Sequence, residues 1–290
     1  MKTFEVTFNS MNSETYPKPI TVLVIAPDKM NSETGAMLFT HGWGGNRFQH
    51  QDKMEYSVNK FNIVCISVEF RMSGYDFNMT TGRGAYLPYD GSFMQTFDVL
   101  NGLRFILTMM PKINRKRLFN YGGSQGGCIA LLCSIFAPET FAFTYASSAI
   151  TYFDKIHIEW CGREFADHEI SIRSAVEHTE LIKCPILLEH GTADETVPHE
   201  HTKKIVEKLK ALNKQVTVKY YEGGAHSLEP AITKIEAFKA MAADPMTNLT
   251  CDTEDDFMAG RTIKIPCGEK TLIIDWSQPT DSIKLFHWKF

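Results

Sequence analysis

The stretch Leu118-Phe-Asn-Tyr-Gly-Gly-Ser124-Gln-Gly-Gly127 is the strongest signal in this 290-residue chain. It begins with a short apolar run, typical of a buried strand, and leads into an apolar helical segment over 128–137 that Pro138 closes. Between the two lies a turn so tight that side chains on both sides of the serine would clash, which explains the glycines. A strand–turn–helix of this kind lifts the Ser124 hydroxyl above the sheet edge. The alternative is a glycine-rich turn with an incidental serine.

Strand and helix patterns alternate on both sides of that stretch. Segment 2–27 predicts two strands, and further strands are predicted at 35–40, 63–68, 118–121, 141–146, 186–190 and 216–221. Helical spacing of apolar residues predicts helices at 93–110, 128–137, 199–212 and 229–242. This alternation predicts an α/β fold, with a mostly parallel central sheet and helices on both faces. In such sheets ligands bind at the carboxyl ends of the strands, where the Gly- and His-rich motifs of this chain fall.

Composition excludes several classes of protein. Thirty Lys and Arg against 34 Asp and Glu give a net charge of −4, which offers no reason to expect a nucleic-acid surface. A hydrophobic fraction of 43% excludes disorder, and no stretch approaches the roughly 18 apolar residues of a membrane span. The seven cysteines include no C-x-x-C pair, so we expect neither a disulfide framework nor a zinc site. The first residues show no signal peptide, so we expect a cytoplasmic protein without nucleic-acid or membrane partners.

A serine hydroxyl is a weak nucleophile, so Ser124 requires a histidine base and a carboxylate that orients it. His190-Gly-Thr-Ala-Asp194 follows one predicted strand, and Gly223-Gly-Ala-His226 follows the next. Their order along the chain, Ser124, Asp194 and His226, suits a catalytic triad that needs no metal or organic cofactor. Helix capping is the alternative role for Asp194 and for His226, and Glu195 is the nearest competing acid.

The negative charge that develops on an attacked carbonyl oxygen requires two backbone N–H donors. We expect one at Gln125, directly after the serine, and the other at Trp43 in the loop His41-Gly-Trp-Gly-Gly45. Glycines beside Trp43 allow the backbone to approach the substrate closely. The Trp43 ring either lines the substrate pocket or serves packing alone.

Together these motifs resemble the α/β-hydrolase superfamily, and the chain looks most like prolyl-oligopeptidase-like hydrolases and dienelactone hydrolases. Glu69-Phe-Arg71-x-Ser-Gly74 and Leu181–Leu188 are also similar to that group, and the likeness covers about residues 20–243. The motif around Ser124 is similar to that of cephalosporin C deacetylases and acetyl xylan esterases. The resemblance implies an α/β-hydrolase fold and a serine hydrolase that works through an acyl-enzyme.

Two departures from the prolyl oligopeptidases favour an ester substrate. Only 40 residues stand before His41, too few for one blade of the β-propeller that those peptidases carry. Those peptidases also use a tyrosine side chain as an oxyanion donor, whereas the loop at Trp43 suits a backbone donor. We therefore expect an esterase or deacetylase acting on a small-molecule ester. The alternatives are a peptidase of prolyl-oligopeptidase type acting on short peptides, and a non-catalytic binding protein on a hydrolase scaffold.

Two segments lie outside the regular series. Residues 151–182 form an insertion that we expect to act as a lid, with Trp160, Phe165 and Arg163 joining Trp43 in binding substrate, and with Arg163 or Arg173 holding an acidic group. Packing is the alternative for each. His199 and His201 are expected to be solvated. We expect residues 1–244 to form the catalytic domain and 245–290 a β-rich C-terminal extension packed on it. The strands of the extension pair with the N-terminal strands, or with a second chain to form a homodimer.

Overall fold

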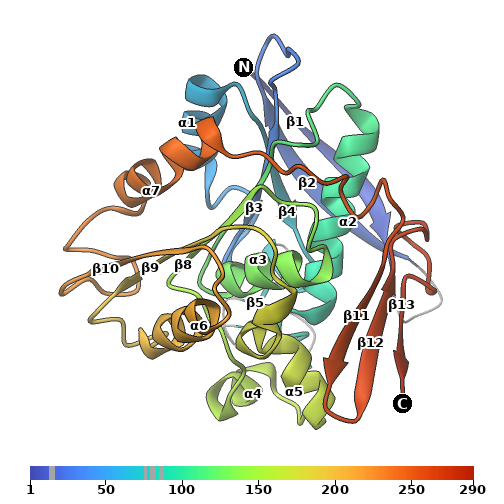
Figure 1. Cartoon of the computed structure of the whole chain (residues 1–290), viewed down its shortest axis with the longest axis vertical. Helices are drawn as coiled ribbons and strands as arrows, with labels where there is room; N and C mark the ends of the chain where they lie inside the picture. The colour runs from blue at the N-terminus through green and yellow to red at the C-terminus, as the bar shows by residue number, and fades with distance from the viewer. Residues whose placement is uncertain (13–16, 75–76, 79–82, 85–87) are drawn as a thin grey trace.

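The computed structural model describes residues 1–12, 17–74, 77–78, 83–84 and 88–290 (Figure 1). Its centre is an eight-stranded sheet in the order β1-β2-β4-β3-β7-β8-β9-β10. The six strands from β4 to β10 in that order are parallel to one another. Strand β2 runs antiparallel to both of its neighbours, β1 and β4. The strands span Lys2–Ser10 (β1), Lys18–Ala26 (β2), Ala36–Thr40 (β3), Val64–Glu69 (β4), Leu118–Gly123 (β7), Phe143–Ser147 (β8), Ile186–Gly191 (β9) and Val216–Tyr221 (β10). The predicted α/β fold with a mostly parallel sheet is confirmed.

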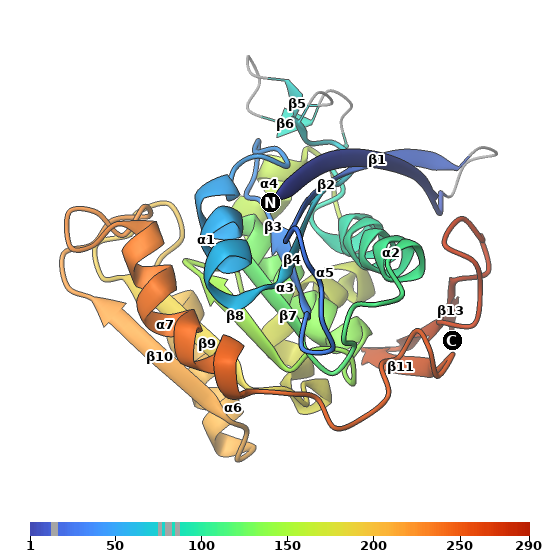
Figure 2. The same cartoon turned by 90° about the horizontal axis from the view of Figure 1, so that it is seen from above.

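Helices cover both faces of this sheet (Figure 2). On one face lie α1 (Gln51–Phe61) and α7 (Lys234–Asn248), which share an apolar core with alternate side chains of the strands. On the other face α2 (Phe93–Met109), α3 (Gln125–Phe136) and α6 (Glu200–Ala211) enclose a larger core. The central strands are therefore buried on both sides, which explains their nearly continuous apolar sequences. Among the described residues, no helix has the length and apolar character needed to cross a membrane.

Two helices differ from the prediction. Helix α1 was not predicted, because its sequence is mostly polar and only one side, including Met54 and Val58, is buried. The predicted helix at 229–242 is wrong in its bounds: α7 begins after Thr233, whose hydroxyl accepts a hydrogen bond from the Glu236 N–H. It then continues through Pro245, because Phe238, Ala242 and Met246 share one buried face. The boundary predicted between residues 244 and 245 therefore falls inside a helix.

The insertion at 151–182 consists of short helical pieces. They are α4 (Lys155–Cys161), α5 (Asp167–Arg173) and the 3₁₀ segment η2 (Ala175–Leu181). Asp154 caps α4 by accepting hydrogen bonds from two backbone N–H groups, and Gly162 ends that helix with a φ of 67°. The glycine-rich stretch before α2 contains a short two-stranded ladder of β5 (Phe77–Asn78) and β6 (Arg83–Gly84).

The C-terminal strands form a separate antiparallel sheet of β11 (Thr262–Cys267), β12 (Lys270–Asp275) and β13 (Phe286–Lys289). They pair with one another, so the predicted option of pairing with the N-terminal strands is wrong. This sheet lies beside α2 (Figure 1), and its buried side chains join the larger core. Trp276, just after β12, is fully buried and donates a 2.8 Å hydrogen bond from Nε1 to the Phe136 carbonyl at the end of α3.

Trp276 therefore fixes the C-terminal sheet to the end of α3 and the larger apolar core. We predict that Trp276→Ala lowers the free energy of unfolding by about 3–5 kcal/mol, because it leaves a large cavity and an unpaired carbonyl. Urea denaturation monitored by circular dichroism measures this change. Ile283→Ala is the matched control, since Ile283 is 71% exposed and its truncation should change stability by less than about 0.5 kcal/mol. Equal effects of the two variants would contradict this role of Trp276.

Candidate active site

Ser124 stands at the turn between β7 and α3 in a conformation that few residues other than glycine adopt. Its φ is 58° and its ψ is −123°. A Cβ on Gly122 would lie 2.0 Å from the Gly126 carbonyl oxygen, and one on Gly126 would lie 2.1 Å from the Thr40 oxygen. Neither position can therefore carry a side chain without displacing backbone. The sequence argument for the two glycines is confirmed, and Ser124 remains partly exposed at the sheet edge.

Asp194 and His226, expected from separate motifs, are joined by a hydrogen bond. His226 Nδ1 lies 2.7 Å from Asp194 Oδ2. Since a carboxylate only accepts hydrogen bonds, the proton lies on Nδ1 and the lone pair on Nε2. The Asp194 side chain is fully buried, whereas that of His226 is 26% exposed. Glu195, the competing acid, is exposed and has no hydrogen bond to His226.

The carboxylate of Asp194 is held on every side. Its Oδ1 accepts the backbone N–H groups of Thr196 and Val197, both at 2.9 Å. Its Oδ2 also accepts from His190 Nε2 at 3.1 Å, while His190 Nδ1 accepts from the Thr202 hydroxyl. Burial by itself raises the pKa of Asp194, but the hydrogen bonds from His190, His226 and Val197 outweigh it and hold the pKa well below its usual range. Asp194 is therefore an anion throughout the neutral range.

Ser124 and His226 are both attached to the end of β8. Strands β7, β8 and β9 are neighbours, and their register pairs Gly123 with Ser147. The Ser124 N–H donates a 2.8 Å hydrogen bond to the Ser147 carbonyl. The next residue, Ser148, donates its hydroxyl to the His226 carbonyl at 3.3 Å. Parallel strands thus gather the three expected residues at one edge of the sheet.

The loop that carries Trp43 closes over the turn of Ser124. A Cβ built on Gly42 would lie 3.5 Å from the Ser124 Cβ, so the loop backbone reaches the nucleophile turn. The loop is anchored by His41, which is buried, stacks on Phe70 with 4.0 Å between ring centroids, and contacts the Ser73 hydroxyl at 3.2 Å. Burial lowers the pKa of His41 to about 4, so its imidazole is neutral.

Only some of the predicted binding residues meet near this loop. Trp160 on α4 forms a T-shaped pair with Trp43, with 5.7 Å between ring centroids. Phe165, by contrast, is only 8% exposed and packs between the guanidinium groups of Arg163 and Arg173. Arg163 itself is bound to Glu169 at 2.8 Å. In the structure, Phe165 therefore packs inside the insertion, and Arg163 pairs with Glu169 of the same insertion.

Two expectations about charged residues of the insertion and α6 are wrong. Arg173 is 2% exposed, and its guanidinium donates to the backbone carbonyls of Asp90 and Glu169, so it is not available to hold an acidic ligand. His201 is buried instead of solvated. It stacks on Tyr152 and accepts the Thr151 N–H, and burial lowers its pKa to about 3. A position inside the first turn of α6 directs His201 to the core side of that helix.

Sequence reasoning missed several residues around the site. Tyr89 and Gln95 contact Gln125, and His190 contacts Asp194. Tyr89 lies at the end of a polar, glycine-rich stretch without periodicity, and Gln95 is a polar residue of a predicted helix, so no pattern distinguished them. Among the described residues, no group of three or more His, Cys, Asp or Glu side chains is arranged to hold a metal ion.

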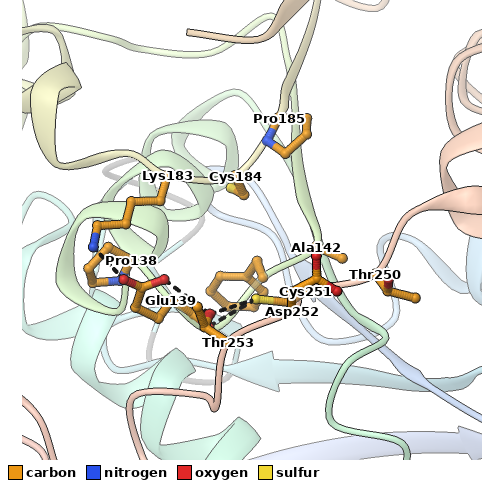
Figure 3. Close-up of a pocket in the computed structure, with 11 residues that line it drawn as sticks. Pro138, Glu139, Ala142, Lys183, Cys184, Pro185, Thr250, Cys251, Asp252 and Thr253 are labelled. Atoms are coloured by element: carbon orange, nitrogen blue, oxygen red, sulfur yellow. Dashed lines mark hydrogen bonds and ion pairs between the residues drawn. The ribbon is translucent and has the colours of Figure 1, made fainter.

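A cavity of about 200 Å³ lies elsewhere in the molecule (Figure 3). Its wall includes Ala142 and Pro185, which directly precede β8 and β9. The cavity is therefore at the amino ends of the parallel strands, opposite the edge that carries Ser124. Figure 3 shows Glu139 paired with Lys183 and bonded to Thr253 across it. None of the expected catalytic residues lines this cavity.

The fold and the comparisons with known proteins define the class as a serine hydrolase of the α/β-hydrolase fold. The chain belongs to the prolyl oligopeptidase family, whose model matches residues 95–244. The model of the acetyl xylan esterase family matches residues 1–153. The two matches overlap on α2, the turn of Ser124 and β8, so the expected resemblance to both groups is confirmed.

Two curated relatives share part of the sequence. The chain is 25% identical over 137 residues to the uncharacterized peptidase YtmA of Bacillus subtilis, covering 43% of this chain and 53% of that protein. It is 24% identical over 232 residues to acyl-protein thioesterase 1 of Emericella nidulans, covering 76% of this chain and 90% of that protein.

Solved structures show the same fold. An acylaminoacyl peptidase in complex with Z-Gly-Gly-Phe-chloromethyl ketone superposes with a TM-score of 0.68 at 19% identity, over 88% of this chain and 43% of the peptidase. A putative dipeptidyl aminopeptidase IV from Bacteroides ovatus gives a TM-score of 0.69 at 15% identity, over 86% of this chain and 36% of that one. The chain thus spans about half of YtmA and less than half of these solved peptidases.

The hydrogen bonds to Asp194 make a prediction about stability. The unfolded chain binds a proton at this carboxyl near pH 4, whereas the folded protein binds it only at lower pH. Asp194 therefore contributes stability above about pH 4, and this contribution is lost as the pH falls through the lowered folded-state pKa. Asp194→Asn should lower the free energy of unfolding at pH 7 by about 1–3 kcal/mol. The variant should also lose less of this free energy than the parent protein as the pH falls.

Urea denaturation of the parent protein and of Asp194→Asn between pH 3 and 7 measures how the free energy of unfolding of each depends on pH. Glu195→Gln is the matched control, because Glu195 is exposed and its variant should keep the pH dependence of the parent protein. If Asp194→Asn lost as much free energy of unfolding between pH 7 and 3 as the parent protein, the lowered pKa of Asp194 would be contradicted.

Proposed function

We propose that this serine hydrolase is an esterase or deacetylase in which Ser124, His226 and Asp194 form the catalytic triad. The observation that carries the proposal is the 2.7 Å bond between His226 and Asp194 at the same sheet edge as the strained turn of Ser124. Ser124 Oγ attacks the carbonyl carbon, and His226 Nε2 takes the hydroxyl proton. Asp194 keeps the imidazole in the tautomer that leaves Nε2 free to do so.

The later steps follow from the same arrangement. The N–H groups of Gln125 and Trp43 hold the oxyanion of the tetrahedral intermediate, and His226 returns its proton to the leaving alcohol. Water then attacks the acyl-enzyme with His226 again acting as base, which releases the acid and restores Ser124. The close approach of Gly42 to Ser124 supports a backbone donor from this loop.

An ester substrate is favoured by several observations. The N-terminal half of the chain matches the acetyl xylan esterase family, and the relative whose length is covered to 90% is named a thioesterase. Tyr89, whose ring stacks on that of Trp43, donates its hydroxyl to Gln125, so this phenol is engaged within the protein and is not offered as an oxyanion donor. We propose a small acyl group, bound against the ring of Trp43 with Trp160 beside it.

A peptidase acting on short peptides is the second candidate. Residues 95–244 match the prolyl oligopeptidase family, and this segment includes all three proposed triad residues. The chemistry of the triad is the same for esters and amides, so the difference lies in protonation of the leaving amine and in the shape of the substrate pocket.

We predict that Ser124→Ala lowers kcat for p-nitrophenyl acetate on the order of 10⁴-fold or more, because it removes the hydroxyl proposed to form the acyl-enzyme. It should also abolish labelling by a fluorophosphonate probe. Ser277→Ala is the matched control, because Ser277 is exposed in the turn after β12, and this variant should keep ester turnover and labelling at Ser124. Activity retained in Ser124→Ala would contradict the assignment.

A second prediction separates the two candidates. Nitrophenyl esters with acyl chains of two to eight carbons should be hydrolysed, with the highest kcat/KM for the shortest, and acetylated sugars should release acetate. Dipeptide nitroanilides should release no detectable nitroaniline. The reverse order, with nitroanilides cleaved at rates comparable to esters, would establish the peptidase instead.

A further inference from the structure

Tyr89 touches each of the two residues proposed to hold the oxyanion. Its ring stacks on the ring of Trp43, with 4.1 Å between centroids and 30° between planes. Its hydroxyl donates a 3.0 Å hydrogen bond to Gln125 Oε1. Tyr89 is fully buried, and burial raises the pKa of its phenol, so the hydroxyl keeps the proton that it donates. One side chain thus connects the loop after β3 to the first residue of α3.

The Gln125 side chain is held from the other direction by Gln95. Gln125 Nε2 donates to Gln95 Oε1 at 2.9 Å, and the same oxygen accepts the Ser92 N–H at 2.8 Å. Gln95 Nε2 in turn donates to the Arg71 carbonyl at 3.0 Å. The chain of donors therefore has one direction, in which Gln125 accepts from Tyr89 and donates to Gln95. Both glutamines are buried, so the loss of any link leaves a polar group unpaired.

The backbone of Tyr89 adds a third connection, to the insertion. Its N–H donates a 2.9 Å hydrogen bond to the carbonyl of Cys161, the last residue of α4. The same helix carries Trp160, whose ring forms a T-shaped pair with that of Trp43. Tyr89 therefore lies where the oxyanion loop, the nucleophile helix and the insertion meet.

We propose that Tyr89 is a positioning residue that sets the separation and direction of the two oxyanion donors, Trp43 and Gln125. This inference rests on the proposed function. Oxyanion donors act only when they are aimed at the position of the developing charge, so a small displacement costs rate and leaves the binding of the ground-state ester unchanged. The ring of Tyr89 orients Trp43, and its hydroxyl orients the first turn of α3 through the Gln125 side chain.

Tyr89→Phe removes one oxygen atom and keeps the ring that stacks on Trp43. We expect kcat for p-nitrophenyl acetate to fall about tenfold with KM unchanged, the factor expected for one buried hydrogen bond that acts in the transition state. A trifluoromethyl ketone, which forms a tetrahedral adduct with serine, should lose affinity by the same factor. Tyr56→Phe is the matched control, because Tyr56 lies on α1 and its variant should keep the kcat of the parent protein.

A second variant reaches the same bond from its acceptor side. Gln125→Met keeps the backbone N–H and removes the acceptor of the Tyr89 hydroxyl, so the double variant with Tyr89→Phe should be no slower than Gln125→Met alone. Independent, multiplying effects on kcat would overturn the proposal, as would an unchanged kcat in Tyr89→Phe. A parallel loss of kcat and thermal stability without loss of ketone affinity would show a structural role only, which also overturns it.

The assays separate this proposal from the proposed function. If Ser124→Ala is inactive and Tyr89→Phe keeps full kcat, Ser124 remains the nucleophile and only the role of Tyr89 is wrong. If Ser124→Ala keeps its activity, the oxyanion assignment and the role of Tyr89 are wrong together.

Discussion

The rest of the site depends on a steric constraint at the turn between β7 and α3. Gly122 and Gly126 lie so close to neighbouring backbone that a Cβ at either position would overlap a carbonyl oxygen. This contact forces Ser124 into a positive φ and fixes α3 against the end of β3. The loop of Trp43 begins at that same strand end, so the turn brings it to the serine. Strained backbone of this kind persists only where the surrounding structure determines it, here the parallel strands on both sides.

The sequence predicted the parts of the molecule in which local pattern and tertiary environment agree. The central strands are apolar because both of their faces are buried, and the motifs around Ser124, Asp194 and His226 follow those strands directly. It failed where packing overrides pattern. Helix α1 buries only a narrow face, and α7 passes through Pro245 because Met246 is buried. His201 and Arg173 look like surface residues in the sequence, yet both are buried, His201 against Tyr152 of the insertion and Arg173 against the Asp90 carbonyl.

The polar network behind the site is the part that sequence reasoning could not reach. The network joins Gln125 to Tyr89 and Gln95, two residues that are far from it in the sequence. Only the fold brings their side chains together. The insertion is joined to the same network through the hydrogen bond from the Tyr89 N–H to the Cys161 carbonyl. On the proposed function, the segment expected to set specificity is therefore connected to the residues proposed to hold the oxyanion.

The most direct test of this account is to identify the residue that becomes acylated. The protein is mixed with p-nitrophenyl acetate, quenched in acid within milliseconds, digested and analysed by tandem mass spectrometry. We expect a mass increase of one acetyl group per chain, on Ser124 and at no other residue, that appears together with a burst of nitrophenol. An adduct on a cysteine or on another serine, or rapid turnover without an adduct on Ser124, would contradict it.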